Sequence, residues 1–251
     1  MKKTLELLLS QRLFIGVVLL ISLSASPLRR DSLSNYMVIW NVGQGQWVTA
    51  VREKECLHFD VGGEFFPWKK LKALCKAREN KIFLSHWDWD HIGGLAKWPS
   101  WSSCLALPPS GKSSKRKMKM LERFSGCANT ENVIQQWSPS NIKSLKDTNS
   151  ASHVVEYQQF LMPGDSPRTQ EKIWRTNSWI GKARVLVLGH HGSRTSTSTE
   201  LLDNLPHLQM AVASARWARY HHPHAETESL LKQHHIALLR TEDWGNLWFE
   251  L

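Results

Sequence analysis

Short apolar runs alternate with polar, glycine-rich loops along most of the chain, and this pattern predicts many β-strands. A helix is expected over Trp68–Glu79, because Leu71, Leu74 and Cys75 recur on one face, and another begins near Ile92. The strands expected in the first half are Tyr36–Val42, Gln46–Arg52, Cys56–Val61, Ile82–Leu84 and Cys104–Leu107.

The second half repeats this arrangement, with strands first and then strands mixed with helices. Helices are expected over Arg168–Trp179 and Glu226–His235. The expected strands are Glu131–Trp137, Ser152–Tyr157, Gln158–Met162, Arg184–Leu188, Met210–Ser214, Ile236–Arg240 and Asn246–Glu250. The repetition favours an α/β fold of two packed sheets with helices outside, rather than one parallel wound sheet.

The first 30 residues have the order of an export signal. Lys2, Lys3 and Arg12 precede the apolar run Leu13–Leu23, and small residues follow before Pro27. The run is short for a membrane span, which needs roughly 20 residues. Residues 1–30 are therefore predicted to be a cleaved signal peptide or an uncleaved inner-membrane anchor, with a hydrolase domain over 33–251. In both cases the domain would be exported, to the periplasm or another extracytoplasmic location.

Composition is that of a globular protein, with 41% apolar and 22% charged residues among 251. The formal charge of +10 favours an anionic partner, either nucleic acid or an anionic lipid surface, although a merely basic soluble protein has the same charge. The segment 111–124 concentrates six Lys or Arg against one Glu. Lys115, Arg116 and Lys117 are candidate phosphate contacts, the alternative being a solvated helical face.

The four cysteines form no CxxC pair, which argues against a structural zinc knuckle. If the chain is exported, one or two disulfides are allowed, and Cys104–Cys127 is a plausible pair around the basic segment.

Candidate chemistry is concentrated in Lys81–Leu95 (KIFLSHWDWDHIGGL). Four residues with metal-ligand side chains follow the apolar run directly: His86, Asp88, Asp90 and His91. A polar surface loop is the alternative. Two further strand ends carry ligand-type residues, Asp165 and the pair His190 and His191. Two cations about 3.5–4 Å apart need roughly six such ligands, and this set has that size.

These motifs resemble the metallo-β-lactamase superfamily and, more narrowly, the metallohydrolase domain of the ComEC family of bacterial competence proteins. The resemblance extends from about residue 36 to the C-terminus in the family's order. It is carried by Asn41–Gln46 (NVGQGQ), Asp60-Val61-Gly62, the HxDxDH loop, Pro163-Gly164-Asp165, His190–Ser196 (HHGSRTS), Tyr220–His224 (YHHPH) and Arg240–Gly245 (RTEDWG).

The resemblance implies an αββα sandwich with two divalent metal ions, Zn²⁺ or Mn²⁺, at one edge. It implies that His86 and Asp88 bind the first ion, and that Asp90 and His91 bind the second. Asp165 would bridge the two. The closing ligand would be His190, with His191 as the alternative or as a phosphate contact.

The chain departs from the superfamily at several positions. Asn149 stands where many members have a further histidine ligand, and His153 nearby could substitute. Asn41 and Gln46 replace two aspartates of the opening motif, which changes the charge near the site. ComEC proteins usually carry many membrane helices, whereas this chain has at most one candidate. It would therefore not form a DNA channel by itself, and a membrane channel protein is a candidate partner.

The expected reaction is metal-assisted hydrolysis of a phosphodiester in DNA, single-stranded DNA in particular, during uptake. Asp90 or Asp165 would orient the nucleophile and His222 the leaving group. His191, Ser193 and Thr241 would contact phosphate, and for His222 and Thr241 the alternative is loop stabilisation. Trp87 or Trp89 could stack on bases. Two other hypotheses stay open: a small-molecule esterase or lactamase-like hydrolase of the same fold, and a metal-depleted DNA-binding module serving a membrane channel.

Overall fold

The computed structural model describes residues 35–128, 134–145 and 147–251. The expected leader over residues 1–30 lies outside these ranges, as does the start of the domain at residue 33. Asn35–Leu251 forms one compact unit. In the part of the chain that is described, no helix is both long enough and apolar enough to cross a membrane.

Two mixed β-sheets form the centre of this unit. The first has seven strands, in the order β13 (Leu247–Glu250), β1 (Tyr36–Ile39), β2 (Trp47–Val51), β3 (Glu55–Val61), β4 (Glu79–Phe83), β5 (Ser103–Leu107) and β6 (Ser125–Gly126). The second has six, in the order β12 (Ala237–Arg240), β11 (Met210–Ala213), β10 (Val185–Val187), β9 (Phe160–Met162), β8 (Val154–Tyr157) and β7 (Gln135–Trp137).

Inner strands of the sandwich, such as β2, β3 and β10, are buried on both faces, which explains the short, continuous apolar runs. In β10, Val185 and Val187 pack between the sheets, whereas Leu186 packs under the outer helices. In β3, Leu57 and Phe59 point into the layer between the sheets. Parallel strands buried on both sides are typically such Val- and Leu-rich runs.

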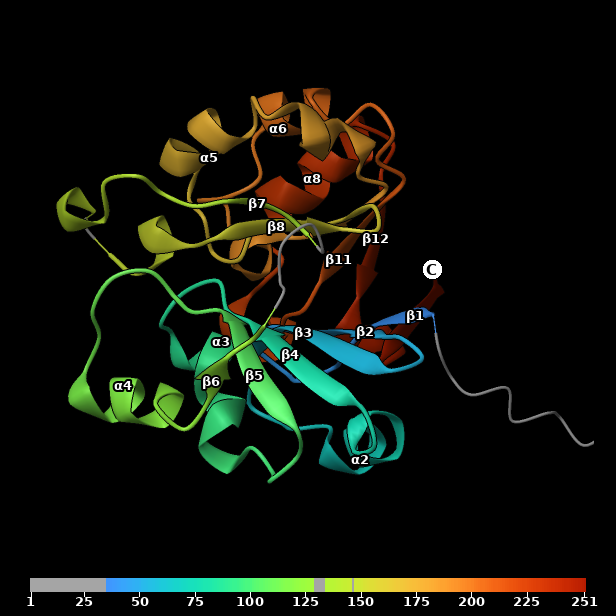
Figure 1. Ribbon diagram of the computed structural model, residues 1–251. Helices are drawn as coiled ribbons and strands as arrows, with labels where there is room; N and C mark the ends of the chain where they lie inside the picture. The colour runs from blue at the N-terminus through green and yellow to red at the C-terminus, as the bar shows by residue number, and fades with distance from the viewer. Residues whose placement is uncertain (1–34, 129–133, 146) are drawn as a thin grey trace, which may run out of the picture. The chain divides into compact units, whose positions relative to one another are not determined.

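Helices cover the outer face of each sheet (Figure 1). On the first sheet they are α2 (Trp68–Cys75), α3 (Trp89–Ile92), the 3₁₀ helix η1 (Gly93–Lys97) and α4 (Lys115–Leu121). On the second they are α5 (Arg168–Trp174), α6 (Thr199–Asp203) and α8 (Ala225–Gln233). Short connecting helices are η2 (Ile142–Ser144), η3 (Asn149–Ala151), η4 (Ser178–Lys182), η5 (Gly189–Gly192), α7 (Trp217–Tyr220) and α9 (Thr241–Trp244). The αββα sandwich expected from the motifs is confirmed.

Two helices are shorter than their sequence pattern predicted. The helix starting at Trp68 ends at Cys75, because Glu79 already pairs with Glu55 as the first residue of β4. The helix starting at Arg168 ends at Trp174. There the side chains of Thr176 and Asn177 donate hydrogen bonds to carbonyls of the last turn, which closes the helix. Of the strand expected over 131–137, residues 131–133 lie outside the described ranges.

Candidate metal centre

The parallel strands of both sheets deliver the site residues to one edge of the sandwich. The loop after β4 carries His86 and Asp90, the turn after β9 carries Asp165, and the loop after β10 carries His190 and His191. Because the carboxyl ends of parallel strands meet at one edge, residues more than 100 positions apart become neighbours.

The Asp165 carboxylate lies at the centre of four imidazoles. Its Oδ1 is 3.0 Å from His91 Nε2 and 3.8 Å from His191 Nε2. Its Oδ2 is 3.8 Å from His86 Nε2 and 3.7 Å from His190 Nε2. Each oxygen of one carboxylate therefore faces its own pair of ring nitrogens.

Two further carboxylates complete this arrangement. Asp88 Oδ2 lies 3.5 Å from His86 Nε2, and Asp90 Oδ2 lies 3.2 Å from His191 Nε2. Asp88 is also held by the hydroxyl of Thr148, which donates to its Oδ1 at 2.8 Å. The six residues predicted as ligands thus come together, and His191 joins them as a seventh.

The Nδ1 atoms of the histidines are engaged outside the cluster, which leaves Nε2 directed inward. His91 Nδ1–H donates to Asp60 at 2.7 Å, and His191 Nδ1–H donates to the Ser214 carbonyl at 3.0 Å. His86 Nδ1 contacts Ser85 Oγ at 2.9 Å. Outer partners of this kind set the tautomer that presents Nε2 as a metal ligand.

Two inward atoms lack a hydrogen-bond partner. His86 Nε2 and Asp165 Oδ1 are buried without one among the described residues. His91 Nε2 and His191 Nε2 lie 3.3 Å apart, and each also faces a carboxylate, Asp165 Oδ1 at 3.0 Å and Asp90 Oδ2 at 3.2 Å. Buried polar atoms are rarely left unsatisfied, and a divalent cation would satisfy these. The donor set therefore fits a metal.

The electrostatics of the cluster also favour positive charge at its centre. Burial opposes protonation of His91, yet Asp165 and Asp60 raise the pKa of this residue well above its usual value. Burial likewise opposes ionisation of Asp165, yet His91 and His191 hold its pKa well below the usual range. A site that stabilises a cationic ring in a fully buried position would also stabilise a metal cation.

Close backbone packing holds the ligand loops in place. At Gly62 an added Cβ would lie 2.2 Å from the backbone of Asp90, and at Gly164 it would lie 2.6 Å from Ser85. His190 and His191 both adopt left-handed backbone conformations, with φ of 49° and 55°. Such strain in consecutive non-glycine residues is typical of functional sites.

Asp60 contacts the cluster from outside, and the sequence did not reveal this position. Its carboxylate accepts hydrogen bonds from Ser85 N and Oγ at 2.7 Å, from His91 at 2.7 Å and from Gln46 Nε2 at 2.9 Å. Its position at a strand end within the Asp60-Val61-Gly62 motif was the available signal. The neutral Gln46 serves here as a donor that an aspartate could not replace, whereas Asn41 accepts a bond from Gly43 N.

His153 does not take the place of the missing superfamily histidine. Its Nε2 donates to the Pro108 carbonyl at 3.0 Å and its Nδ1 contacts Ser138 Oγ at 2.7 Å. Both ring nitrogens are thus occupied away from the cluster. Asn149 is the first residue of η3.

A cavity of about 460 Å³ opens onto the cluster, lined by Gln44, Gly63, Glu64, Trp89, Asp90, His190, His191, Tyr220 and His222. His222 Nδ1 lies 3.4 Å from Gln44 Nε2. Burial, followed by the charges of His191 and His190, lowers the pKa of His222 to about 4. This histidine is therefore neutral at pH 7.

The other residues predicted to contact phosphate do not line the cavity. Thr241 is fully buried and donates to the Ala213 carbonyl at 3.4 Å, and Ser193 Oγ bonds Thr195 at 2.9 Å, so neither lines the cavity. The Thr241 contact fits the loop-stabilising alternative. Lys115, Arg116 and Lys117 form the first turn of α4.

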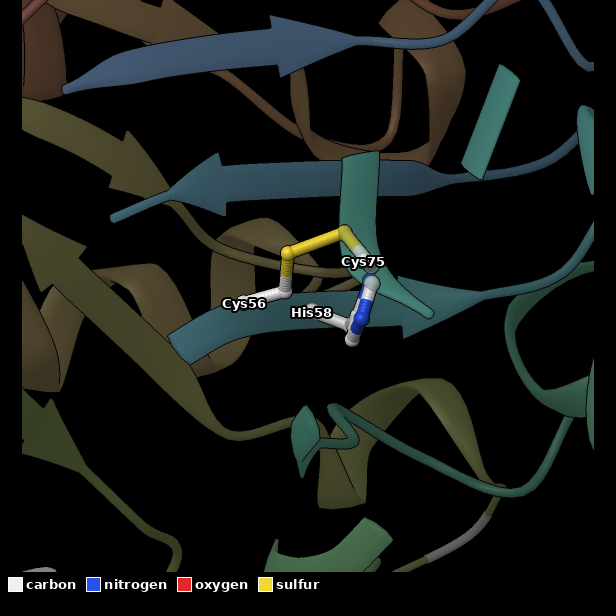
Figure 2. A group of neighbouring side chains, drawn as sticks. All are labelled: Cys56, His58 and Cys75. Atoms are coloured by element: carbon white, nitrogen blue, oxygen red, sulfur yellow. A yellow bond between two sulfur atoms is a disulfide. The ribbon is translucent and has the colours of Figure 1, made fainter. Parts of the chain in front are cut away.

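A second group of ligand-type side chains, Cys56, His58 and Cys75, is no metal site in this structure. Figure 2 shows the disulfide between Cys56 and Cys75, with His58 beside it. The ring nitrogens of His58 are 3.0 Å from Thr49 Oγ1 and 3.0 Å from Asn80 Oδ1. Thiolates and a vacant imidazole nitrogen, which a cation would need, are both absent from this group. The other disulfide, Cys104–Cys127, confirms the pairing expected around the basic segment.

Sequence comparison finds similarity to competence proteins. Competence protein ComA of Neisseria gonorrhoeae is 31% identical over 238 residues, covering 86% of this chain and 32% of that protein. ComE operon protein 3 of Bacillus subtilis is 26% identical, covering 83% and 32%. Recombination protein 2 of Haemophilus influenzae is 27% identical, covering 82% and 28%. The chain spans about a third of the length of these relatives, and no protein-family model matches it.

Two solved structures share the fold. The metallo-β-lactamase fold protein YhfI of Bacillus subtilis superposes with a TM-score of 0.51 at 12% identity, covering 82% of this chain and 95% of that one. A diphosphatase of the PhnP family superposes with a TM-score of 0.50 at 14% identity, covering 86% and 98%. The resemblance to competence proteins and to the metallo-β-lactamase fold is therefore confirmed.

Proposed function

We propose that this chain is a metal-dependent hydrolase of phosphodiesters in DNA. The proposal is supported by its metallo-β-lactamase fold and by its sequence similarity to part of several competence proteins. The observation that carries the proposal is the set of four imidazole Nε2 atoms directed at the two oxygens of Asp165. A complete and well-oriented donor set supports a metal-binding enzyme over a metal-depleted binding module.

Two divalent cations, Zn²⁺ or Mn²⁺, would share the Asp165 carboxylate. His86, Asp88 and His190 would hold one ion, and Asp90, His91 and His191 would hold the other. Bound cations would supply the positive charge that polarises a phosphate and activates water. His190 and His191 would thus both be ligands, rather than alternatives for one position.

The protein's own residues would position the substrate. His222, neutral at pH 7 and beside Gln44 on the cavity wall, would hydrogen-bond the leaving oxygen. Lys115 and Arg116, at the exposed start of α4, would attract the phosphate backbone towards the cavity. The short distance from α4 to the metal loop supports this role, because Lys117 Nζ donates to the Trp87 carbonyl.

The proposed setting is DNA uptake outside the cytoplasm, with a membrane channel protein as partner. The names of two sequence relatives, competence protein ComA and ComE operon protein 3, support the competence context. The use of all four cysteines in disulfides supports an oxidising compartment, since structural disulfides are rare in the cytosol. Membrane association through the N-terminal segment remains part of this proposal.

A nuclease assay on the purified full chain tests the proposal. With added Mn²⁺ or Zn²⁺, we expect cleavage of single-stranded oligonucleotides, and Asp90→Ala should abolish it. Asp203→Ala, an exposed aspartate of α6, is the matched control and should leave cleavage unchanged. Excess unlabelled DNA should compete with a chromogenic phosphodiester. An absence of competition, with the small ester cleaved, would favour the esterase instead.

A further inference from the structure

Two exposed aromatic side chains lie among the residues that line the metal-site cavity. Trp89 is 40% exposed and Tyr220 is 39% exposed. They come from different elements, α3, which carries Asp90 and His91, and α7, which ends two residues before His222. Large apolar side chains left exposed beside a site typically mark a binding surface.

Trp89 is held by the basic helix α4. The Arg116 guanidinium and the Lys117 ammonium each lie 5.2 Å from the centre of its ring. The residue sits between two predicted ligands, Asp88 and Asp90, and lines the cavity together with Asp90. An aromatic ring next to phosphate-binding cations is the combination that single-stranded nucleic-acid sites use.

Tyr220, on α7, also has a cationic side chain beside its ring. The Arg219 guanidinium lies 5.1 Å from its ring centre. Arg219 and Arg216 in turn bond the Glu64 carboxylate at 2.9 and 3.0 Å, which ties α7 to the cavity wall. Tyr220 is also close in sequence to His222, which lines the cavity.

Trp87, the other tryptophan of the metal loop, does not have this role. It is only 6% exposed, and its Nε1–H donates to the Ser110 carbonyl at 2.9 Å. Its ring packs in the core of the first sheet with the outer helices. The structure thus separates two tryptophans that the sequence pattern could not distinguish.

We infer that Trp89 and Tyr220 are two base-stacking platforms that make the site selective for single-stranded nucleic acid. Bases in a duplex already stack on their neighbours and pair with the opposite strand, so their faces are not available to protein rings. Unpaired bases on either side of the bound phosphate can lie on the two rings. This inference rests on the proposed function, because it takes the cavity as the place where the phosphodiester binds.

Binding to two single strands of equal length, one with bases and one without, tests the inference. The full chain is titrated, in chelator to prevent turnover, into labelled oligothymidylate and into an abasic strand of equal length, with anisotropy as the readout. Trp89→Leu and Tyr220→Leu should each weaken oligothymidylate binding by about 5- to 150-fold and leave abasic binding unchanged. Trp89→Phe and Tyr220→Phe keep a ring and should retain most of the preference for bases.

Trp248→Leu is the matched control. Trp248 is 42% exposed but packs against Tyr36 and Trp40 on an edge strand, and it should change neither affinity. Equal losses on both strands, no loss on either, or the same loss in the Phe and Leu variants would overturn the inference. If the wild type cleaves no DNA with Mn²⁺ or Zn²⁺, the proposed function fails, whereas the base preference in chelator still decides whether the rings stack.

Discussion

At the scale of single residues, His58 shows how a buried polar group is accommodated away from the site. Trp40 Nε1–H donates to Thr49 Oγ1 at 2.8 Å, the Thr49 hydroxyl contacts His58 Nδ1, and His58 Nε2–H donates to Asn80 Oδ1. Asn80 Nδ2 then donates to backbone carbonyls. This chain of hydrogen bonds accommodates a neutral imidazole, whereas a protonated ring would place a second N–H against the donors around Nδ1.

His58 should make folding stability depend on pH. Burial lowers the pKa of His58 to about 4, although the bond to Asn80 acts in the opposite direction. The folded pKa lies below the unfolded value of about 6.5, so the full free energy of unfolding is present above pH 6.5. As pH falls towards 4, the free energy of unfolding should decrease by about 1.4 kcal/mol per pH unit, about 3 kcal/mol in total.

Urea unfolding of the wild type and His58→Gln at several pH values measures this effect. The variant lacks the titrating ring, so the difference in unfolding free energy between the two proteins should shift by about 3 kcal/mol from pH 7 to pH 4. Parallel stability curves for the two proteins would contradict the assignment.

At the scale of elements, α4 combines a basic surface with a fixed position. Ser114 caps its first turn by accepting a bond from Lys117 N, and Met120 and Leu121 bury its inner face. The Cys104–Cys127 disulfide closes the segment that contains it. Composition alone also allowed this basic run to be a solvated helical face. In the structure it lies against the metal loop.

Neutralising α4 should reduce the salt dependence of DNA binding. Lys115→Gln with Lys119→Gln removes two exposed cations, and each lost phosphate contact should lower the slope of log affinity against log salt by about 0.7. The measurement is anisotropy on single-stranded DNA from 50 to 300 mM salt, roughly the range where the slope is well defined. Lys69→Gln with Lys70→Gln, on α2, makes the same charge change and should leave the slope as it is. Equal slopes in the wild type and the α4 variant would remove α4 from the interface.

At the scale of the whole molecule, both disulfides lie in the half of the chain that forms the first sheet. Cys56–Cys75 joins β3 to α2 across 19 positions, and Cys104–Cys127 spans 23. No free cysteine remains. The second half has no such link, and its stability depends on burial between its sheet and helices.

Removing the second disulfide should destabilise the fold. A closed loop of this length stabilises by about 3 kcal/mol through the unfolded chain, so Cys104→Ala with Cys127→Ala should lose about 2–4 kcal/mol in urea unfolding. Because the same link closes the segment carrying α4, DNA affinity should fall as well. Unchanged stability in the oxidised protein would show that this link does not constrain the chain.

Metal binding should stabilise the whole domain, because the ligands come from both sheets. A ligand at about 100 times its dissociation constant adds about 2.7 kcal/mol per site, so Mn²⁺ or Zn²⁺ should raise the melting temperature and a chelator should lower it. Asp165→Asn should abolish this response, since Asp165 faces both sets of ligands. Asp203→Asn should preserve it. A full metal response in Asp165→Asn would contradict the shared carboxylate.

The strand pattern, the αββα sandwich and the types of ligand residue could all be predicted from the sequence. Periodicity depends on local alternation, and HxDxDH places four donors within six positions whatever lies around them. Helix ends were predicted less well, because pairing of Glu79 with β3 and capping by Asn177 override local propensity. The roles of the individual ligands stay predictions.

The orientation of each side chain was decided by tertiary structure alone. From the sequence alone, His190 could not be distinguished from His191, nor Trp87 from Trp89. In the fold, the left-handed backbone at both histidines directs each ring to a different oxygen of Asp165. The sequence by itself thus determined which chemical groups reach this edge. Their directions depend on backbone angles and on hydrogen-bond partners far away along the chain, such as the Ser214 carbonyl that orients His191, and these exist only once the two sheets have packed.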